Sequence, residues 1–301
     1  MPDGLSIRPP HEKYLLSSRQ SLNYIILALT AANPLLAADT WTPLFNGRDL
    51  AGWTMFMAKP DRTWDVPGLK RDPAGNYLEP IGGNRDPLQV FAVETVDGRP
   101  AIHVSGQGFG VITTTAAFAD FHLRLQVKWG EKKWGAKRNA PRDCGLLYLC
   151  HGEPGFDHET WPRSIEFQIQ EHDMGDLFAL GAQITVPARP EGRLWRYDAT
   201  GAPTLFVQKP PVGNRCVKLL DAEKPKGEWN SLELICLGGD SLHIVNGKVV
   251  MRLYHAQRLD GTEPAPLTSG QISLQTEGAE VYYRDVEIRP ITAIPVAFAG
   301  P

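Results

Sequence analysis

The stretch SIEFQIQEHDMGD, residues 164–176, alternates apolar and polar side chains over its first seven positions. Successive side chains of a β-strand point to opposite faces, so the apolar residues share one face and the polar residues share the other. The apolar face holds Ile165, Phe167 and Ile169, and the polar face holds Glu166, Gln168 and Gln170. The pattern predicts a β-strand with one packed face and one polar face that binds a ligand, performs catalysis or meets water.

Similar strand-like runs recur along the chain, separated by turn signals. They are FHLRLQVKW (121–129), GLLYLCH (145–151), SLELICL (231–237), SLHIVNGKVVMRL (241–253), GQISLQTEG (270–278) and VYYRDVEIRP (281–290). Asn246-Gly247 suits a type I′ hairpin turn, because both residues tolerate positive φ. These runs predict an all-β sandwich of two antiparallel sheets. The long loops are expected at 55–90, 130–142, 151–163 and 184–227.

Composition supports one folded domain over residues 39–290, followed by a tail at 291–301. The chain has 301 residues, of which 42% are hydrophobic, and this is enough apolar material for a packed core. Its formal net charge of −3 comes from mixed signs without a basic stripe, so no nucleic-acid partner is expected.

The N-terminal region differs from the rest of the chain. An apolar run from Leu22 to Ala32 is followed by small residues at Ala37 and Ala38, which predicts a signal peptide over residues 1–38 and export. An apolar helix or membrane anchor is the alternative. No later stretch has the ~20 apolar residues that a membrane span requires. Export would permit disulfides, although buried thiols are equally compatible with Cys144, Cys150, Cys216 and Cys236.

Four segments occur in an order that resembles a known family. They are LFNGRDLAGW (44–53), SIEFQIQEHDMGDLF (164–178), GEWNSLELICLGGDSLHIVNGKVV (227–250) and GQISLQTEGAEVYYRDVEIRP (270–290). Together they resemble the 3-keto-disaccharide hydrolase domain family. The resemblance implies a concanavalin A-like jelly roll in an exported bacterial protein, periplasmic or extracellular, that acts on glycosides oxidised at C3 of the sugar.

The polar face does not suit the ordinary glycosidase mechanism. Laminarinase-type enzymes, which share the implied fold, place acids at alternate positions so that two carboxylates flank one glycosidic bond. Here only Glu166 is acidic, because Gln168 and Gln170 are amides. A 3-keto sugar needs a single base, because its ketone acidifies the hydrogen on C2 and the C1 oxygen can then leave by elimination, followed by hydration. Glu166 is the expected base and Gln168 a hydrogen-bond donor, with Lys128 or Arg124 as the stabilising cation.

Two polar clusters flank the strand. Glu171, His172, Asp173 and Asp176 follow it and suit either metal binding or proton relay, with Glu171 and His172 as catalytic candidates, or an ordinary acidic turn. A divalent metal is therefore left open, and no cofactor is assigned. The second cluster, His151 to Glu159, matches no metal motif and is interpreted as a solvated loop.

Aromatic and late-strand residues complete the candidate set. Trp161 is a candidate sugar platform, and Trp134 and Trp195 also lie in or beside long loops, where they either bind sugar rings or anchor the loops. Gln275 and Glu277 end a late strand that the resemblance places beside the site, with Glu277 as a second acid.

The expected function is hydrolysis of an oxidised glycoside. The alternatives are a non-catalytic carbohydrate-binding module and a structural domain. The chain carries no dinucleotide fingerprint, so a separate sugar 3-dehydrogenase is the expected functional partner.

Overall fold

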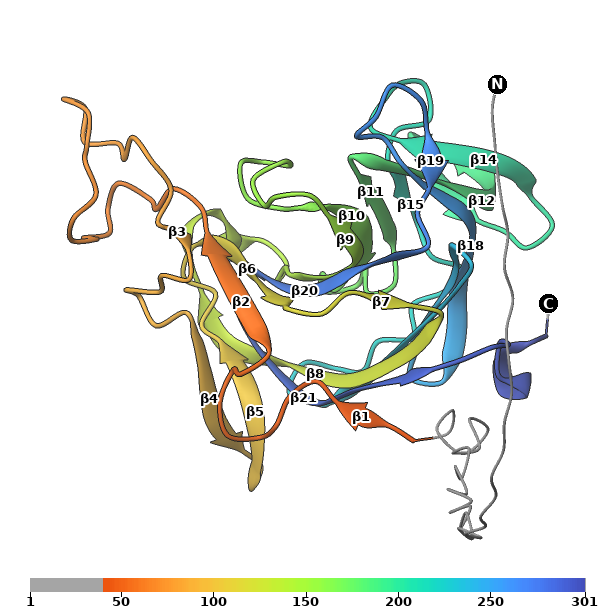
Figure 1. The fold of residues 1–301 in the computed structure, drawn as a ribbon, viewed down its shortest axis with the longest axis horizontal. Helices are drawn as coiled ribbons and strands as arrows, with labels where there is room; N and C mark the ends of the chain where they lie inside the picture. The colour runs from red at the N-terminus through yellow and green to blue at the C-terminus, as the bar shows by residue number, and fades with distance from the viewer. Residues whose placement is uncertain (1–39, 301) are drawn as a thin grey trace, which may run out of the picture. The chain divides into compact units, whose positions relative to one another are not determined.

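Two stacked antiparallel β-sheets make up the described part of the chain, residues 40–300 of the computed structural model. In Figure 1 the two sheets are seen nearly edge-on. Strands β20 and β6 belong to one sheet and lie above strands β8 and β21, which belong to the other. The all-β sandwich prediction is confirmed. Helical structure within these residues is confined to two short 3₁₀ turns, η2 (Gly135–Asn139) and η3 (Val296–Phe298).

The first sheet has twelve strands within the described residues. Its path runs β13 (Leu194–Tyr197), β12 (Ala182–Glu191), β18 (Lys248–Arg258), β17 (Asp240–Val245), β16 (Asn230–Leu237), β8 (Phe121–Lys133), β21 (Ala279–Pro290), β5 (Arg99–Val104) and β4 (Phe91–Val96). Three strands pair off this path: β1 (Thr42–Pro43), β14 (Ala202–Val207) and β19 (Ala265–Pro266).

The second sheet carries the strand predicted from residues 164–176. Its order is β15 (Arg215–Cys216), β11 (Leu177–Leu180), β10 (Arg163–Gln168), β9 (Gly145–His151), β20 (Ser269–Glu277), β6 (Phe109–Thr114), β2 (Trp53–Met57) and β3 (Gly82–Gly83), with β7 (Phe118–Ala119) paired to β20. The predicted strand is therefore central, between β9 and β11.

The apolar face of β10 packs into the core between the sheets. Ile165, Phe167 and Ile169 are fully buried. The Phe167 ring stacks on His243 of β17 in the facing sheet, with ring centroids 4.3 Å apart. Burying a side chain of this size contributes about 1.5–3 kcal/mol to stability. Because successive side chains alternate, the polar face of β10 is directed away from the core.

Strand β9 contains a bulge that its nearly continuous apolar sequence conceals. Leu149 has a positive φ of 52°, and the pairing of β9 shifts register there with both neighbours. The extra residue lets the adjacent Tyr148 and Leu149 both pack in the core, whereas Leu147 and Cys150 both contribute to a smaller cluster on the opposite face. A bulge of this kind re-aims side chains without ending the sheet.

Several sequence expectations can be compared directly with the fold. Asn246 and Gly247 both have positive φ between the paired ends of β17 and β18, which confirms the hairpin turn. The expectation of a loop at 184–227 is wrong, because β13 and β14 both pair with β12 in this region. The error arose because prolines interrupt the apolar alternation, although Pro187 and Pro203 are accommodated as paired residues at this extension.

For the two ends of the chain, the sequence predicts a signal peptide and a tail. The predicted signal peptide lies outside the described residues. Of the predicted tail, Ile291, Ile294 and Phe298 pack on the outer face of the first sheet, against the cluster that includes Ile235. The four cysteines are buried free thiols. In the part of the chain that the structure describes, no helix has the length and apolar character needed to cross a bilayer.

His243 makes the stability of the sandwich pH-dependent. Its Nδ1 lies 3.0 Å from the Gly175 carbonyl oxygen and its Nε2 lies 3.0 Å from the Tyr148 hydroxyl. A carbonyl can only accept, so Nδ1 carries the proton and the neutral ring is fully satisfied. Burial lowers the pKa of His243 to about 4.

We therefore expect the free energy of unfolding to fall by up to about 3 kcal/mol as the pH drops from about 6.5 to 4, because the unfolded chain binds the proton more tightly. Urea titrations at several pH values measure this fall. His243→Gln should be less stable at neutral pH but should lose this part of the pH dependence. An unchanged pH dependence in that variant would contradict the assignment.

Candidate functional site

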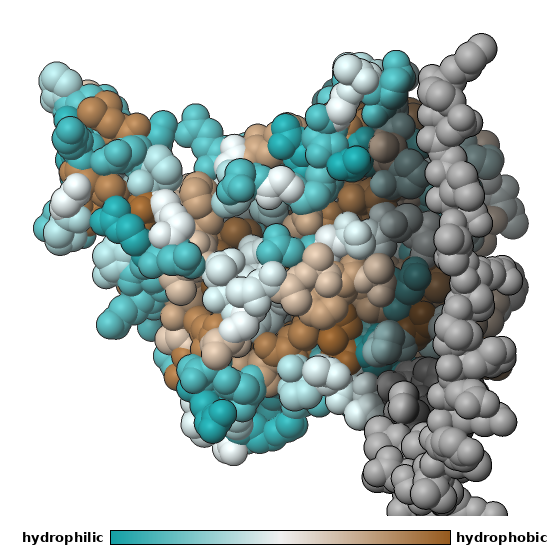
Figure 2. All heavy atoms as spheres, viewed as in Figure 1, coloured by the Kyte–Doolittle hydropathy of each residue, from teal (hydrophilic) through white to brown (hydrophobic). Residues whose placement is uncertain are grey.

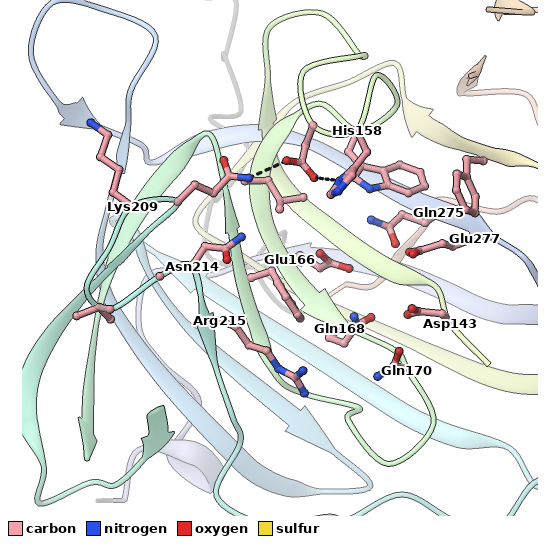
Figure 3. A pocket seen from close by; sticks show the side chains of 18 of the residues that line it. Asp143, His158, Glu166, Gln168, Gln170, Lys209, Asn214, Arg215, Gln275 and Glu277 are labelled. Atoms are coloured by element: carbon pink, nitrogen blue, oxygen red, sulfur yellow. Dashed lines mark hydrogen bonds and ion pairs between the residues drawn. The ribbon is translucent and has the colours of Figure 1, made fainter. Parts of the chain in front are cut away.

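The polar face of β10 opens into a cavity of about 1070 Å³. Figure 3 shows Glu166 and Gln168 facing Gln275, Glu277 and Asp143 across this space. The remaining walls come from two loops, one between β9 and β10 and one between β14 and β15. We call this space the acid cavity. Its lining is Phe109, Asp143, Asp157, His158, Glu159, Trp161, Glu166, Gln168, Gln170, Phe178, Leu180, Gln208, Lys209, Pro210, Pro211, Val212, Gly213, Asn214, Arg215, Gln275 and Glu277.

Five of the nine residues predicted for the site converge on this cavity, and they come from two strands and one loop. Glu166 and Gln168 lie two positions apart on β10, and Gln275 and Glu277 lie two positions apart on β20. Each pair shares a face because the strand period is two. Strand β9 separates β10 from β20, and Trp161 lies just before β10.

Gly145 leaves the space in which the two strands' polar groups meet. It pairs with Gln168 at the start of β9. A Cβ atom at this position would lie 2.2 Å from Glu166 Oε1 and 2.6 Å from Gln275 Oε1. These distances are shorter than van der Waals contact, so the carboxyl and the amide occupy the space that a side chain at residue 145 would fill.

Three carboxyl groups gather here beside one lysine. Lys137, on η2, forms an ion pair with Asp143, and its Nζ lies 3.8 Å from Glu277 Oε1. Burial raises the pKa of Glu166 well above its usual value, and the neighbouring charges of Glu277 and Asp143 raise it further. Burial and Asp143 likewise raise the pKa of Glu277, to about 8, against the opposing effect of Lys137. At neutral pH the cluster therefore retains protons that isolated carboxyls would lose.

Two amides add hydrogen-bonding capacity to the cluster. The Gln168 carbonyl oxygen accepts from the Ile169 backbone N–H at 2.8 Å, which leaves its NH₂ group to face the cavity. Gln275 is 1% exposed, and neither its Nε2 nor its Oε1 has a hydrogen-bond partner among the described residues. Asp143 Oδ1 is likewise buried and unpaired there. Buried polar groups are normally satisfied, so these atoms are available to water or to a polar ligand.

An apolar wall lies beside the acids on the same face of the sheet. It belongs to a cluster of Val111, Leu147, Cys150, Trp161 and Leu180, with Phe56 and Phe178 packed against them. Of this cluster, Trp161, Leu180 and Phe178 line the cavity. The rings of Phe109 and Trp161 have centroids 6.0 Å apart. A cavity with one apolar wall and one hydrogen-bonding wall suits a sugar ring, whose faces and edges differ in the same way.

The loop at 151–163 contributes to the cavity more than the sequence indicated. Its Asp157 accepts from Gln208 Nε2 at 2.7 Å and contacts His158 Nδ1 at 2.8 Å, as the dashed lines in Figure 3 mark. The bond to Gln208 connects the two loops that wall the cavity. Interpreting the whole segment as solvated is therefore wrong for Asp157, although His158 and Glu159 remain largely exposed.

Four predicted site residues lie elsewhere. Lys128 and Arg124 are on β8 of the first sheet, and they form ion pairs with Asp97 at 3.0 Å and with Glu287 at 2.6 Å. Two sheets packed through their apolar faces keep their polar faces apart, so neither cation can reach the acid cavity.

Glu171 and His172 are also outside the cavity lining, because β10 ends before them. The Glu171 carboxylate accepts from the Arg142 backbone N–H at 2.7 Å and from the Arg142 guanidinium at 2.8 Å. His172 has a positive φ of 71° in the following turn, and its side chain is 86% exposed. Of the acidic turn, Asp173 and Asp176 instead form ion pairs with Arg215, which does line the cavity.

Sequence reasoning missed Asp143, Lys137 and Arg215. Asp143 and Lys137 lie in the irregular segment between β8 and β9, and Arg215 begins the two-residue strand β15. None belongs to an alternating run that would indicate its direction. Within residues 40–300, no three His, Cys, Asp or Glu side chains are grouped closely enough to hold a metal ion.

Residues 40–289 match the sequence model of a family described as the 3-keto-alpha-glucoside-1,2-lyase-like domain. No curated protein matches this chain closely enough to count as a relative.

Several solved structures are similar in fold. A candidate glycosyl hydrolase from Parabacteroides distasonis is 20% identical, with 86% of this chain and 98% of that chain covered and a TM-score of 0.46. A second from the same organism is 19% identical, with 84% and 100% covered and a TM-score of 0.42. A carbohydrate-binding module from Bacillus subtilis is 10% identical, with 66% and 91% covered and a TM-score of 0.38.

Gly145→Ala tests the close approach in the cavity. The added Cβ should displace the Glu166 carboxyl and the Gln275 amide, because both lie within 2.6 Å of it. We expect Gly145→Ala to fold as the same sandwich but to lose, in calorimetry, the binding of a ligand that occupies the acid cavity. Gly83→Ala is the matched control, because its Cβ would meet only Met55 O at 3.9 Å. Binding by Gly145→Ala equal to that of the control would contradict the proposed crowding.

Proposed function

Because the chain belongs to the 3-keto-alpha-glucoside-1,2-lyase-like family, we propose that it cleaves glycosides whose sugar is oxidised at C3, by a base-initiated elimination in the acid cavity. The observation that carries the proposal is the buried Glu166 with the amides Gln168 and Gln275 beside it, which suits one base and hydrogen-bond donors for an enolate. The ketone of the substrate acidifies the hydrogen on C2, so the protein does not need to provide this activation.

Glu166 acts as the base in this mechanism. Its carboxylate takes the proton from C2 of the sugar, and the electron pair of the C–H bond passes into an enolate on the C3 oxygen. Burial and neighbouring carboxylates raise the pKa of Glu166, so a smaller fraction of it is ionised at neutral pH, but that ionised form is a stronger base than an exposed glutamate. A base with a pKa closer to neutrality is better matched to removing a carbon-bound proton.

The two amides stabilise the enolate. The NH₂ group of Gln168 is directed to the cavity because its carbonyl oxygen is already bonded to the backbone. The unpaired Gln275 amide is a second donor. Fixed donors that meet charge as it develops lower the barrier, since they need no reorganisation during the reaction.

Glu277 serves as the acid for the departing oxygen. Its pKa of about 8 keeps it protonated at neutral pH. As the enolate re-forms the carbonyl, the C1–C2 double bond forms, the C1–O bond breaks, and the leaving oxygen takes the proton of Glu277. Addition of water across the new double bond then gives the free 3-keto sugar, so elimination and hydration together amount to hydrolysis.

Two features of this function concern other components of the cell. The 3-keto substrate requires a separate sugar 3-dehydrogenase, since the sequence contains no dinucleotide fingerprint. Export is inferred from the leader pattern at residues 1–38. The alternative function, carbohydrate binding without catalysis, draws on the same unpaired amide and apolar wall.

Glu166→Gln separates catalysis from binding. The amide preserves shape but cannot accept the C2 proton, so we expect turnover of a 3-keto-α-glucoside to fall by about 100-fold or more with little change in substrate affinity. Glu171→Gln should retain activity, because Glu171 lies outside the cavity lining and binds Arg142. Wild-type protein that binds the substrate without cleaving it would favour the carbohydrate-binding alternative. Full activity in Glu166→Gln would exclude Glu166 as the base.

The pH profile gives a second test. A base with a raised pKa is inactive at low pH because it is protonated, so kcat/KM should rise with pH through a pKa well above 4.5, the ordinary glutamate value. The acid Glu277, with a pKa of about 8, should cause a decline above that pH. Glu277→Gln should remove the alkaline limb. A profile that is flat from about pH 5 to 9 would contradict both assignments.

A further inference from the structure

A second cavity, of about 530 Å³, adjoins the acid cavity. Its walls come from the segment between β2 and β3 and from η2 with its flanking residues. The segment between β2 and β3 occupies the upper left of Figure 1, and in Figure 2 the same region stands apart from the rest of the visible surface across a hollow. We call this space the tryptophan cavity, because Trp64 and Trp134 both line it.

The border between the two cavities is formed by the end of β20 and the start of β6. Glu277 pairs with Phe109 in the β20–β6 ladder. Phe109 lines both cavities, Glu277 lines the acid cavity, and the next residue, Gly278, lines the tryptophan cavity. Lys137 also lines the tryptophan cavity while contacting Asp143 and Glu277. The group proposed as the acid therefore stands at the boundary.

The aromatic walls are held in place by the surrounding backbone. Trp134 Nε1 donates to the Ser105 carbonyl oxygen at 2.8 Å. The Trp64 ring packs over Gly108, where an added Cβ would lie 3.0 Å from ring atom Cζ3. Both indoles are only partly buried and retain exposed surface at the cavity. Rings fixed in this way offer apolar faces without a large ordering cost on binding.

We propose that the tryptophan cavity is the leaving-group subsite, and that it takes a ring with an apolar face. The inference rests on the proposed elimination, in which the leaving oxygen takes its proton from Glu277. A leaving group attached to that oxygen must extend past Glu277, and the space there is the tryptophan cavity. Two kinds of leaving group present such a ring: an aryl group and a second hexose.

The charges of the lining add a preference. Lys59, Lys137 and Arg138 line the cavity with one carboxylate, Asp61. Lys59 is ion-paired with Glu159 and Lys137 with Asp143, so Arg138 is the cation available to a ligand among the described lining residues. This balance favours a neutral or anionic leaving group over a cationic one. A 4-carboxyphenyl glycoside should therefore bind at least as well as the phenyl glycoside, and a 4-(aminomethyl)phenyl glycoside should bind more weakly.

Calorimetry with unoxidised α-glucosides tests the subsite without requiring turnover. Phenyl α-glucoside and maltose represent the aryl and hexose sources, and methyl α-glucoside is the reference that lacks a leaving-group ring. Stacking on an aromatic side chain is worth about 0.5–1.5 kcal/mol, so at least one ring compound should bind several-fold to about tenfold more tightly than the methyl compound. If the tighter binding of phenyl α-glucoside or of maltose is lost when Trp64 is replaced, that compound carries the kind of leaving group that the subsite recognises.

Variants distinguish the subsite from general affinity. Trp64→Ala should remove the advantage of the ring compound. Ala136→Trp should do the same by filling the cavity from an exposed position, and it serves if Trp64→Ala destabilises the loop. Trp229→Ala is the matched control, since Trp229 packs under Arg284 and lines neither of the two cavities.

The outcomes also separate this inference from the proposed function. Equal affinity for ring and methyl compounds, no binding of either ring compound, or a ring advantage that persists in both cavity variants would overturn the subsite. Failure of the protein to cleave 3-keto-α-glucosides would instead overturn the proposed elimination. A Trp64-dependent ring advantage in a protein without turnover would retain the cavity as a ring-binding subsite and reject its role in elimination.

Discussion

Burying carboxyl groups together is costly unless protons or cations neutralise them, and the acid cavity is organised around this constraint. Asp143, Glu166 and Glu277 have raised pKa values, and Lys137 is the cation that contacts two of the three. Once such a cluster has lost one proton, it holds a carboxylate beside a protonated carboxyl. That state combines a base and an acid in one site, which an elimination with a departing oxygen requires.

The sandwich positions this cluster through a strand with two distinct faces. On the core side of β10, Phe167 stacks on His243 of the opposite sheet, and on the other side Glu166 and Gln168 face the cavity. A movement of β10 would therefore disrupt the packing of the core as well as the geometry of the site. Close packing of the core thus transmits its rigidity to the face that carries Glu166 and Gln168. Gly145 completes the arrangement by leaving room for two polar groups that belong to different strands.

In the proposed reaction, the two cavities hold the two parts of the substrate. The sugar that carries the ketone occupies the acid cavity, with its apolar wall and its amides, and the leaving group extends beyond Glu277 toward Trp64 and Trp134. Segments far apart in the sequence supply these walls: the β2–β3 segment, η2 and the two loops connected by Asp157 and Gln208. In the proposed reaction, the sheets provide the reacting groups and the irregular segments provide the shape that selects the substrate. This division is common because loops vary while a scaffold stays rigid.

The local features of this protein could be predicted from its sequence. A period of two in residues 164–170 is a property of neighbouring residues, so it correctly indicated the strand, its buried face and the shared face of Glu166 and Gln168. Turn chemistry identified the Asn246-Gly247 hairpin, and the family resemblance identified Gln275 and Glu277 as site candidates. Only the tertiary structure decided which polar faces meet. It placed Lys128 and Arg124 on the other sheet and brought Lys137 and Asp143 to the acids. Sheet order and loop paths depend on contacts between residues distant in sequence, and no local periodicity encodes those contacts.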